Sequence, residues 1–132
     1  MTDQPDPVAA WHRVAGSKDP AQLRELLADD VVFRSPAVFS PQKGRAATTL
    51  YLTAAMNVLG PTLRYLDEWY GPTSAVLEFE ADLDGVAVHG VDMLRWNKSG
   101  SLTGFTVMVR PVKGLQELMM RMGAELARLT RQ

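Results

Sequence analysis

The sequence contains no cysteine, and this absence removes several classes of chemistry at once. Disulfide bonds, thiolate nucleophiles and zinc–thiolate sites are all excluded. Histidine is also scarce, because only His12 and His89 are present, and two histidines without cysteine make a weak case for a metal site. We therefore expect a protein that works without a metal ion or any other cofactor.

An excess of one charge sign is lacking as well: 14 Lys and Arg residues face 15 Asp and Glu residues, for a net charge of −1. No basic run forms a stripe that could follow a phosphate backbone, so nucleic acid is not an expected partner. No apolar run approaches the roughly 18 residues that span a bilayer. The acidic, proline-bearing start MTDQPDP also differs from a secretory signal. We expect a cytoplasmic protein that does not bind membranes.

What the chain does have is enough apolar sequence for one folded domain. It is 132 residues long, and 46% of its residues are hydrophobic. A chain of this length can bury a substantial core. We expect a single domain over residues 1–132, with residues 1–6 frayed.

Helical spacing of apolar residues dominates the first half. Pro7 is suited to the first turn of a helix that runs to about Ala15. Asp19-Pro20 supplies an N-cap and a first helical residue for a second helix, which Asp29-Asp30 is expected to end. The pattern further predicts a short strand over 31–34, a loop over 36–44 and a third helix over 45–59.

The second half changes to the alternation that is typical of strands. Asp84-Gly85 is a strong signal for a two-residue hairpin. Pro111 opens a last helix, which is expected to reach about Arg128. Helices first and strands later favour an α+β fold: a curved antiparallel sheet packed against N-terminal helices, with a C-terminal helix over the pocket. The expected strands cover 62–70, 74–83, 86–96 and 101–110.

One of these strands, VHGVDMLRW (88–96), carries an aspartate in a run that looks buried. A buried carboxylate is costly unless another group pairs with it or uses it. Side chains alternate along a strand, so Asp92 shares a face with Val88 and Leu94, and His89 shares the other face with Val91. Both faces are apolar enough to be covered, so periodicity alone does not say which one points inward.

Four stretches of the chain resemble the SnoaL-like branch of the nuclear transport factor 2-like superfamily, which includes ketosteroid isomerase, scytalone dehydratase and limonene epoxide hydrolase. They lie in matching order along nearly the whole chain. The resemblance implies a cone-shaped α+β fold around an apolar pocket, and a homodimer that pairs through the outer face of the sheet. The four stretches are LRELLADDVVFRSP (23–36) after Asp19, Gly44-Arg45, VDMLRWNKSGSLTGF (91–105) and FTVMVRP (105–111).

The resemblance also implies which side chains face inward. It puts Asp92 where ketosteroid isomerase has the protonated aspartic acid of its oxyanion hole, and it makes Asp92 the candidate catalytic residue. It puts His89, Glu78 and Arg110 on the outer face. The residues that we expect to line a ligand-binding pocket are Trp11, Phe33, Ser35, Tyr51, Tyr65, Leu77, Phe79, Phe105, Val107 and Met119.

The chain departs from the isomerase pattern at two positions. Ser35 stands where the isomerase has its catalytic aspartate base, and Trp11 stands near its oxyanion tyrosine. A serine does not exchange a proton at neutral pH as a carboxylate does, so we do not expect ketosteroid isomerase activity. The arginine that accompanies the aspartates of the epoxide hydrolase has no match, and neither His12 nor His89 matches the inward histidines of the dehydratase.

Two interpretations of Asp92 remain open. Desolvation in an apolar pocket would raise its pKa and let it act as an acid or hydrogen-bond donor. Alternatively, it holds the pocket's shape through a hydrogen bond to Trp11, Tyr51 or a water. The first predicts a pocket for a small hydrophobic oxygenated molecule with cofactor-free isomerisation, cyclisation, dehydration or hydrolysis. The second predicts a non-catalytic ligand-binding protein or dimeric scaffold. His12 is expected at the surface in both cases.

Overall fold

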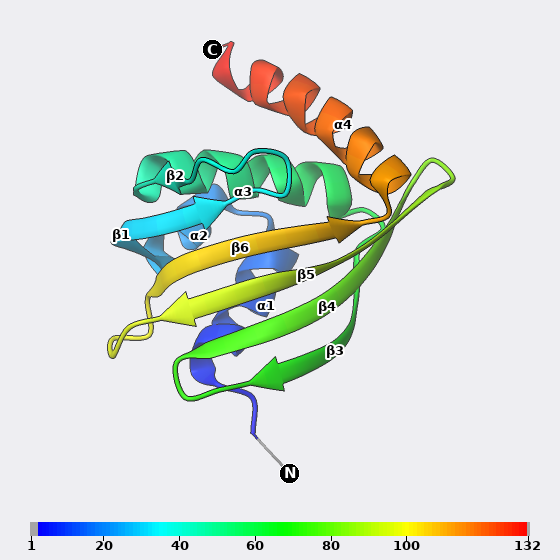
Figure 1. Ribbon diagram of the computed structural model, residues 1–132. Coiled ribbons are helices and arrows are strands. Elements are labelled where there is room, and N and C mark those ends of the chain that lie inside the picture. The colour runs from blue at the N-terminus through cyan, green and yellow to red at the C-terminus, as the bar shows by residue number, and fades with distance from the viewer. Residues whose placement is uncertain (1–2, 132) are drawn as a thin grey trace.

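The computed structural model describes residues 3–131 and has α+β architecture. Three helices precede most of the strands and a fourth ends the chain, as the sequence predicts (Figure 1). Of the first six residues, Met1 and Thr2 lie outside the described residues, and Asp6 already belongs to the first helix. The elements are α1 (Asp6–Ser17), α2 (Pro20–Leu26), β1 (Leu27–Arg34), β2 (Gln42–Lys43), α3 (Arg45–Leu59), β3 (Arg64–Tyr70), β4 (Ser74–Leu83), β5 (Val86–Trp96), β6 (Leu102–Arg110) and α4 (Val112–Thr130).

The strands form one curved six-stranded sheet in the order β2-β1-β6-β5-β4-β3. Strands β3 to β6 pair antiparallel in chain order, as the hairpin signals predict. One pair departs from the predicted antiparallel sheet, because β1 runs parallel to β6. Between β1 and β6 the chain passes through α3 and four further strands, so hairpin signals say nothing about this pairing. The sheet is therefore mixed, with its concave side toward the helices (Figure 1).

The largest difference from the sequence prediction lies at Asp29-Asp30. These residues do not end α2, which stops at Leu26; they lie within β1, where both are exposed. The register of β1 against β6 shifts between Leu27 and Val32, and such a bulge accommodates the exposed pair. Strand β2, inside the stretch predicted as loop, pairs with β1 for two residues only, too few to leave an alternating pattern.

The core lies between the concave face of the sheet and the helices. Inward residues of β4, β5 and β6 alternate with outward ones, as their burial shows. Trp11 of α1 packs edge-on against Phe105 of β6, with ring centroids 4.8 Å apart. Gly90 of β5 leaves room for a neighbouring ring, since a Cβ there would lie 2.7 Å from Cζ of Phe79. The sheet can curve closely around its aromatic core at this point.

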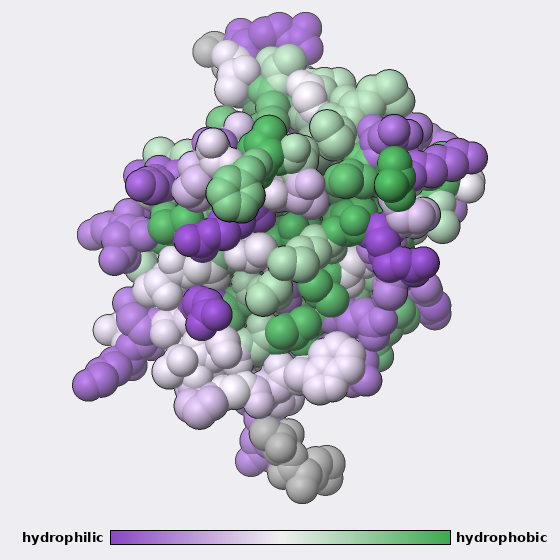
Figure 2. Space-filling view, viewed as in Figure 1, coloured by the Kyte–Doolittle hydropathy of each residue, from purple (hydrophilic) through white to green (hydrophobic). Residues whose placement is uncertain are grey.

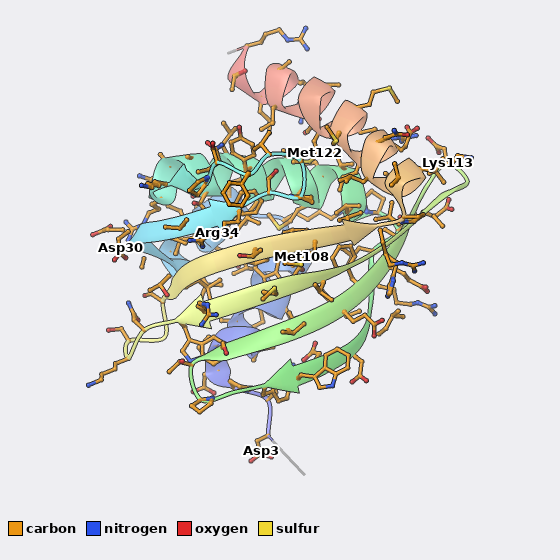
Figure 3. The ribbon with its side chains drawn as sticks, viewed as in Figure 1. Asp3, Asp30, Arg34, Met108, Lys113 and Met122 are labelled. Atoms are coloured by element: carbon orange, nitrogen blue, oxygen red, sulfur yellow. The ribbon has the colours of Figure 1, made fainter. Side chains whose placement is uncertain are left out.

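Helix α4 crosses the open end of the cone next to α3 (Figure 1). Its first turn lies close to β5, because a Cβ at Gly114 would be 2.5 Å from the carbonyl oxygen of Ala87. Met122, farther along α4, faces α3, whereas Met108 lies on the convex face of the sheet (Figure 3). Among the described residues, no helix is long and apolar enough to cross a membrane.

The convex face of the sheet carries apolar side chains as well as charges. In Figure 2, apolar residues gather over β5 and β6 in the middle of this face, with hydrophilic residues around them. Met108 is 56% exposed and Trp69 of β3 is 53% exposed. The predicted outward residues His89 and Glu78 pair on this face, with 2.7 Å between Nε2 and Oε2.

Candidate functional site

A cavity of about 520 Å³ lies between the concave face of the sheet and helices α1, α3 and α4. Its walls are mostly apolar, with a few polar side chains among them. Of the residues predicted to line a pocket, those that border this cavity are Trp11, Phe33, Ser35, Tyr51, Tyr65, Asp92, Phe105, Val107 and Met119.

Leu77 and Phe79 were predicted to line the pocket, and this prediction is wrong for the cavity in the structure. Both side chains do point inward from β4, but they are fully buried in the core. Phe79 packs edge-on against Tyr65, with ring centroids 6.4 Å apart. The correct face was predicted for both residues, but alternation along a strand does not tell which inward side chains other residues cover.

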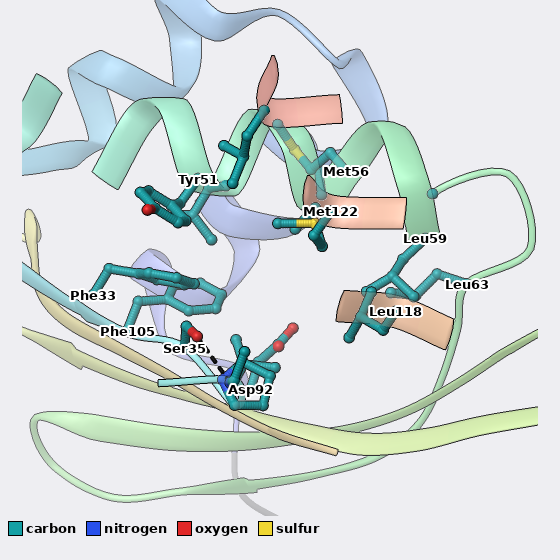
Figure 4. A pocket seen from close by; sticks show the side chains of 18 of the residues that line it. Phe33, Ser35, Tyr51, Met56, Leu59, Leu63, Asp92, Phe105, Leu118 and Met122 are labelled. Carbon is teal, nitrogen blue, oxygen red and sulfur yellow. Dashed lines mark hydrogen bonds between the residues drawn. The ribbon is translucent and has the colours of Figure 1, made fainter. Parts of the chain in front are cut away.

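Asp92 lies at the floor of the cavity, with its carboxyl group directed into it (Figure 4). The residue is only 6% exposed, and burial raises its pKa from 3.8 to about 7. A hydrogen bond from Tyr65 opposes the increase, but desolvation is the larger effect. Near neutral pH, therefore, a substantial fraction of Asp92 is protonated and can donate a hydrogen bond.

The hydrogen-bond partner of Asp92 is Tyr65, whose hydroxyl donates to Oδ2 over 2.6 Å. Trp11 donates in turn from Nε1 to the same hydroxyl, over 2.9 Å. Burial and the adjacent carboxyl raise the pKa of Tyr65 well above its usual value, so the phenol keeps its proton. Sequence reasoning named Trp11, Tyr51 or a water as partner, but Trp11 acts only through Tyr65.

A second polar pair borders the cavity beside Tyr65. His12, expected at the surface, is a cavity-lining residue whose side chain is 28% exposed. Its Nε2 lies 2.5 Å from Oε2 of Glu68 on β3, and its ring packs edge-on against Tyr65 with centroids 4.8 Å apart. Helical spacing could have given a signal, because His12 lies four residues after the buried Val8 and three before Ala15, and so shares a face with both.

Ser35 borders the cavity, but its hydroxyl is engaged in the turn that follows β1. Its Oγ accepts hydrogen bonds from the backbone N–H groups of Ala37, at 2.9 Å, and Val38, at 3.3 Å. This is the turn-forming arrangement that Ser-Pro sequences favour. The residue before Pro36 is thus a turn-forming serine, which supplies no carboxylate to the cavity.

Within residues 3–131, no three His, Asp or Glu side chains lie close enough together to hold a metal ion. Asp92 is the one acidic residue that borders the cavity among the described residues, and its hydrogen-bond partner is a tyrosine.

Comparison with known proteins supports the same architecture. The model of the SnoaL-like domain matches residues 8–105. A crystal structure described as a steroid delta-isomerase from Pseudomonas aeruginosa is 34% identical, covers 96% of this chain and 93% of its own, and superposes with a TM-score of 0.89. A protein with a cystatin-like fold from Silicibacter pomeroyi DSS-3 is 26% identical over 96% of this chain and 87% of its own, with a TM-score of 0.85.

A third structure is similar in fold alone. The epoxide hydrolase/cyclase-like enzyme SalBIII is 17% identical over 82% of this chain and 91% of its own, with a TM-score of 0.67. No curated protein matches the sequence.

Proposed function

The chain belongs to the SnoaL-like family, within the nuclear transport factor 2-like superfamily, and from that premise we propose that its cavity binds a small, mostly apolar molecule that carries a carbonyl or similar oxygen. Protonated Asp92 donates a hydrogen bond to that oxygen. The observation that carries the proposal is the Asp92 carboxyl, which points into an otherwise apolar cavity and has a pKa raised to about 7.

The direction of the hydrogen bonds supports this role for Asp92. Trp11 donates to Tyr65, and Tyr65 donates to Oδ2 of Asp92, so Oδ2 is an acceptor. When Asp92 is protonated, the proton belongs on Oδ1, which has no hydrogen-bond partner among residues 3–131. Hydrogen bonds aligned in one direction strengthen one another. The result is a donor that is ready for a ligand oxygen.

The size and walls of the cavity agree with a ligand of modest size. Pockets for small molecules commonly measure roughly 300–1,000 Å³ and are lined mainly by apolar side chains with a few polar groups. A cavity of about 520 Å³ falls within that range. Aromatic rings such as Phe33 and Tyr51, whose centroids lie 5.8 Å apart, offer flat surfaces to a ring system.

The similarity to the Pseudomonas steroid delta-isomerase suggests a polycyclic ketone as one class of ligand, but it does not restore that protein's reaction here. Ser35 occupies the position where the resemblance places a proton-accepting aspartate, and its hydroxyl is used in a turn. The alternative is a binding protein without catalysis on the same cavity. Both proposals share the donor role of Asp92.

Binding of a simple ketone at different pH values tests that role. 2-Tetralone is a suitable probe because it is bicyclic, mostly apolar and does not ionise in the relevant range. For the wild-type protein, Kd measured by calorimetry should rise about tenfold between pH 5.5 and pH 8.5. The loss of roughly one hydrogen bond weakens binding by about this factor. Asp92→Asn keeps a donor that does not titrate, so its Kd should not depend on pH.

Two further variants serve as controls. Tyr51→Phe removes a hydroxyl from the same cavity, and His12→Gln removes the imidazole that packs against Tyr65. Both should keep the pH dependence of the wild type. An Asp92→Asn protein whose Kd still changes with pH as in the wild type would contradict the proposal, and so would a wild-type protein that does not bind the ketone.

We also propose that two copies of the chain pair through the convex face of the sheet. Met108 and Trp69 expose apolar surface there. The same face carries both charge signs, since Arg64 pairs with Glu80 and His89 accepts a hydrogen bond from Arg110. In a two-fold arrangement each patch meets its own copy, so acidic and basic groups can match across the interface. A face that is apolar and carries both acidic and basic groups favours a second copy of this chain as its partner.

A further inference from the structure

The pair His12–Glu68 lies beside the Asp92 site, and ligand binding by Asp92 does not require it. We propose that His12, oriented by Glu68, is the proton acceptor of this site: it removes a proton from the carbon next to a carbonyl group whose oxygen is held by Asp92. This inference rests on the proposed ligand-binding function and extends it from binding to proton transfer. It also supplies the base that is missing at Ser35.

The surroundings of Glu68 favour its ionised form, which accepts hydrogen bonds. Its Oε1 accepts from the hydroxyl of Tyr70, at 2.5 Å, and from Nε2 of Gln4, at 3.1 Å. Its Oε2 faces His12 at 2.5 Å. Desolvation acts to raise the pKa of Glu68, but the hydrogen bonds from Tyr70, Gln4 and His12 together lower it. The carboxylate therefore has fixed donors around it.

An ionised Glu68 determines which nitrogen of neutral His12 carries the proton. Because Oε2 only accepts, Nε2 must hold the hydrogen, and the lone pair is left on Nδ1. Nδ1 has no hydrogen-bond partner among residues 3–131. A base whose second nitrogen is held by a carboxylate is the arrangement that proton-accepting histidines use in general.

The placement of His12 brings this base close to the acid. His12 borders the cavity, as Asp92 does, and its ring packs edge-on against Tyr65. Tyr65 is also the residue that donates to Asp92. His12 thus contacts the ring of Tyr65, and Asp92 contacts the hydroxyl of the same tyrosine. A small ketone whose oxygen is held by Asp92 would occupy the same cavity that His12 borders.

The proposed step balances without a cofactor. Nδ1 of His12 takes a proton from the α-carbon, and the C–H electrons form a carbon–carbon double bond. The electrons of the C=O double bond move to the oxygen, which takes a hydrogen bond or the proton from Asp92. Reversal of the step returns a proton to carbon, so the ketone exchanges its α-hydrogens with solvent.

A purely structural role for the pair makes a different prediction. In that case the bond between His12 and Glu68 would only tie α1 to β3, and its loss would change stability but no chemistry at a bound ketone. The outer face of the sheet provides a matched control: His89 pairs with Glu78 at 2.7 Å, in a similar histidine–glutamate contact away from the cavity.

Hydrogen–deuterium exchange of 2-tetralone in D2O, followed by proton NMR, tests the proposal. The wild-type protein should speed the exchange of the α-hydrogens well above the buffer rate. His12→Gln should lower the protein-catalysed rate by at least about 100-fold, the usual contribution of a general base, with Kd unchanged. Glu68→Gln should lower the rate less, and His89→Gln should leave it unchanged.

Nitrogen-15 NMR of the free protein gives a second test that needs no ligand. It should find neutral His12 with its proton on Nε2, and Glu68→Gln should disturb that preference. A proton on Nδ1, or a His12→Gln protein that exchanges tetralone at the wild-type rate, would overturn the role of His12. A wild-type protein that binds tetralone without exchanging it would also overturn that role but leave the proposed binding function intact. Absence of binding would overturn both.

Discussion

The hydroxyl of Tyr65 and the carboxyl of Asp92 meet over 2.6 Å although their strands, β3 and β5, are separated by β4 in the sheet. The side chains reach each other because the sheet curves and both point to its concave side. Tyr65 is opposite Phe79, and Phe79 is opposite Gly90, which has no side chain in the way. The absence of a side chain at Gly90 leaves room for Phe79 under Tyr65 and so favours the contact between Tyr65 and Asp92.

The raised pKa of Asp92 makes stability depend on pH. The unfolded chain loses this proton near pH 3.8 and the folded chain near pH 7, so the folded state binds more protons between these values. Stability contributed by Asp92 therefore falls as pH rises through this range and levels off above about 7. At about 1.4 kcal/mol per pKa unit, the loss is about 4 kcal/mol.

Urea unfolding of the wild type and of Asp92→Asn at several pH values measures this effect. Other carboxyl groups, such as Glu125 with its pKa lowered to about 2, contribute equally to both proteins. The difference between the two curves thus isolates Asp92. Asp92→Asn should gain stability relative to the wild type as pH rises from 4 to 7. A constant difference across this range would contradict a raised pKa.

Replacing Tyr65 by phenylalanine should raise the pKa of Asp92 further, because the hydrogen bond from Tyr65 stabilises the ionised carboxylate. It also leaves the indole N–H of Trp11 without its acceptor, at a cost of about 1–3 kcal/mol. Carbon-13 NMR of the carboxyl group and urea unfolding measure the two effects. Tyr51→Phe, in the same cavity, should change neither, and equal effects in both variants would argue against the Trp11–Tyr65–Asp92 chain.

Gly90→Ala should destabilise the fold, because the new Cβ would lie 2.4 Å from the carbonyl oxygen of Met108 and 2.7 Å from the ring of Phe79. Overpacking of this kind costs about 1–3 kcal/mol. Gly16→Ala on α1 is the matched control, since nothing lies within 4 Å of its Cβ and alanine is favoured in a helix by up to about 1 kcal/mol. Thermal unfolding of both variants should therefore shift Tm in opposite directions.

The proposed pairing through the convex sheet face predicts that Met108→Lys shifts the protein toward monomers, because it introduces a charge into the apolar middle of the face. Light scattering after gel filtration measures the molar mass. Met120→Lys is the matched control, because Met120 is 64% exposed on α4, away from the sheet. A wild-type protein that is monomeric at high micromolar concentration would contradict this pairing.

The sequence predicted the fold class and the alternation along β4 and β5, because such patterns survive in long elements. The inward face of β5 came from the family resemblance, since both faces are apolar. Most of the residues predicted to line a pocket do border the cavity, but many of its other lining residues were not predicted. The sequence did not predict the parallel pairing of β1 with β6, which depends on contacts distant in the chain. The role of Tyr65 was also missed, because it depends on register across three strands. Likewise, the Glu68 partner of His12 lies 56 residues away and is defined only by the fold.

The most direct test of the account is the titration of Asp92 by carboxyl carbon-13 NMR in the free protein, with Asp92→Asn to assign the signal. We expect a pKa of about 7, because the carboxyl group is desolvated and Tyr65 only partly stabilises its ionised form. A carboxyl group at the floor of the cavity would then be a donor near neutral pH. A measured pKa of about 4 or below would contradict the proposed donor role of Asp92 and the acid–base chemistry built on it.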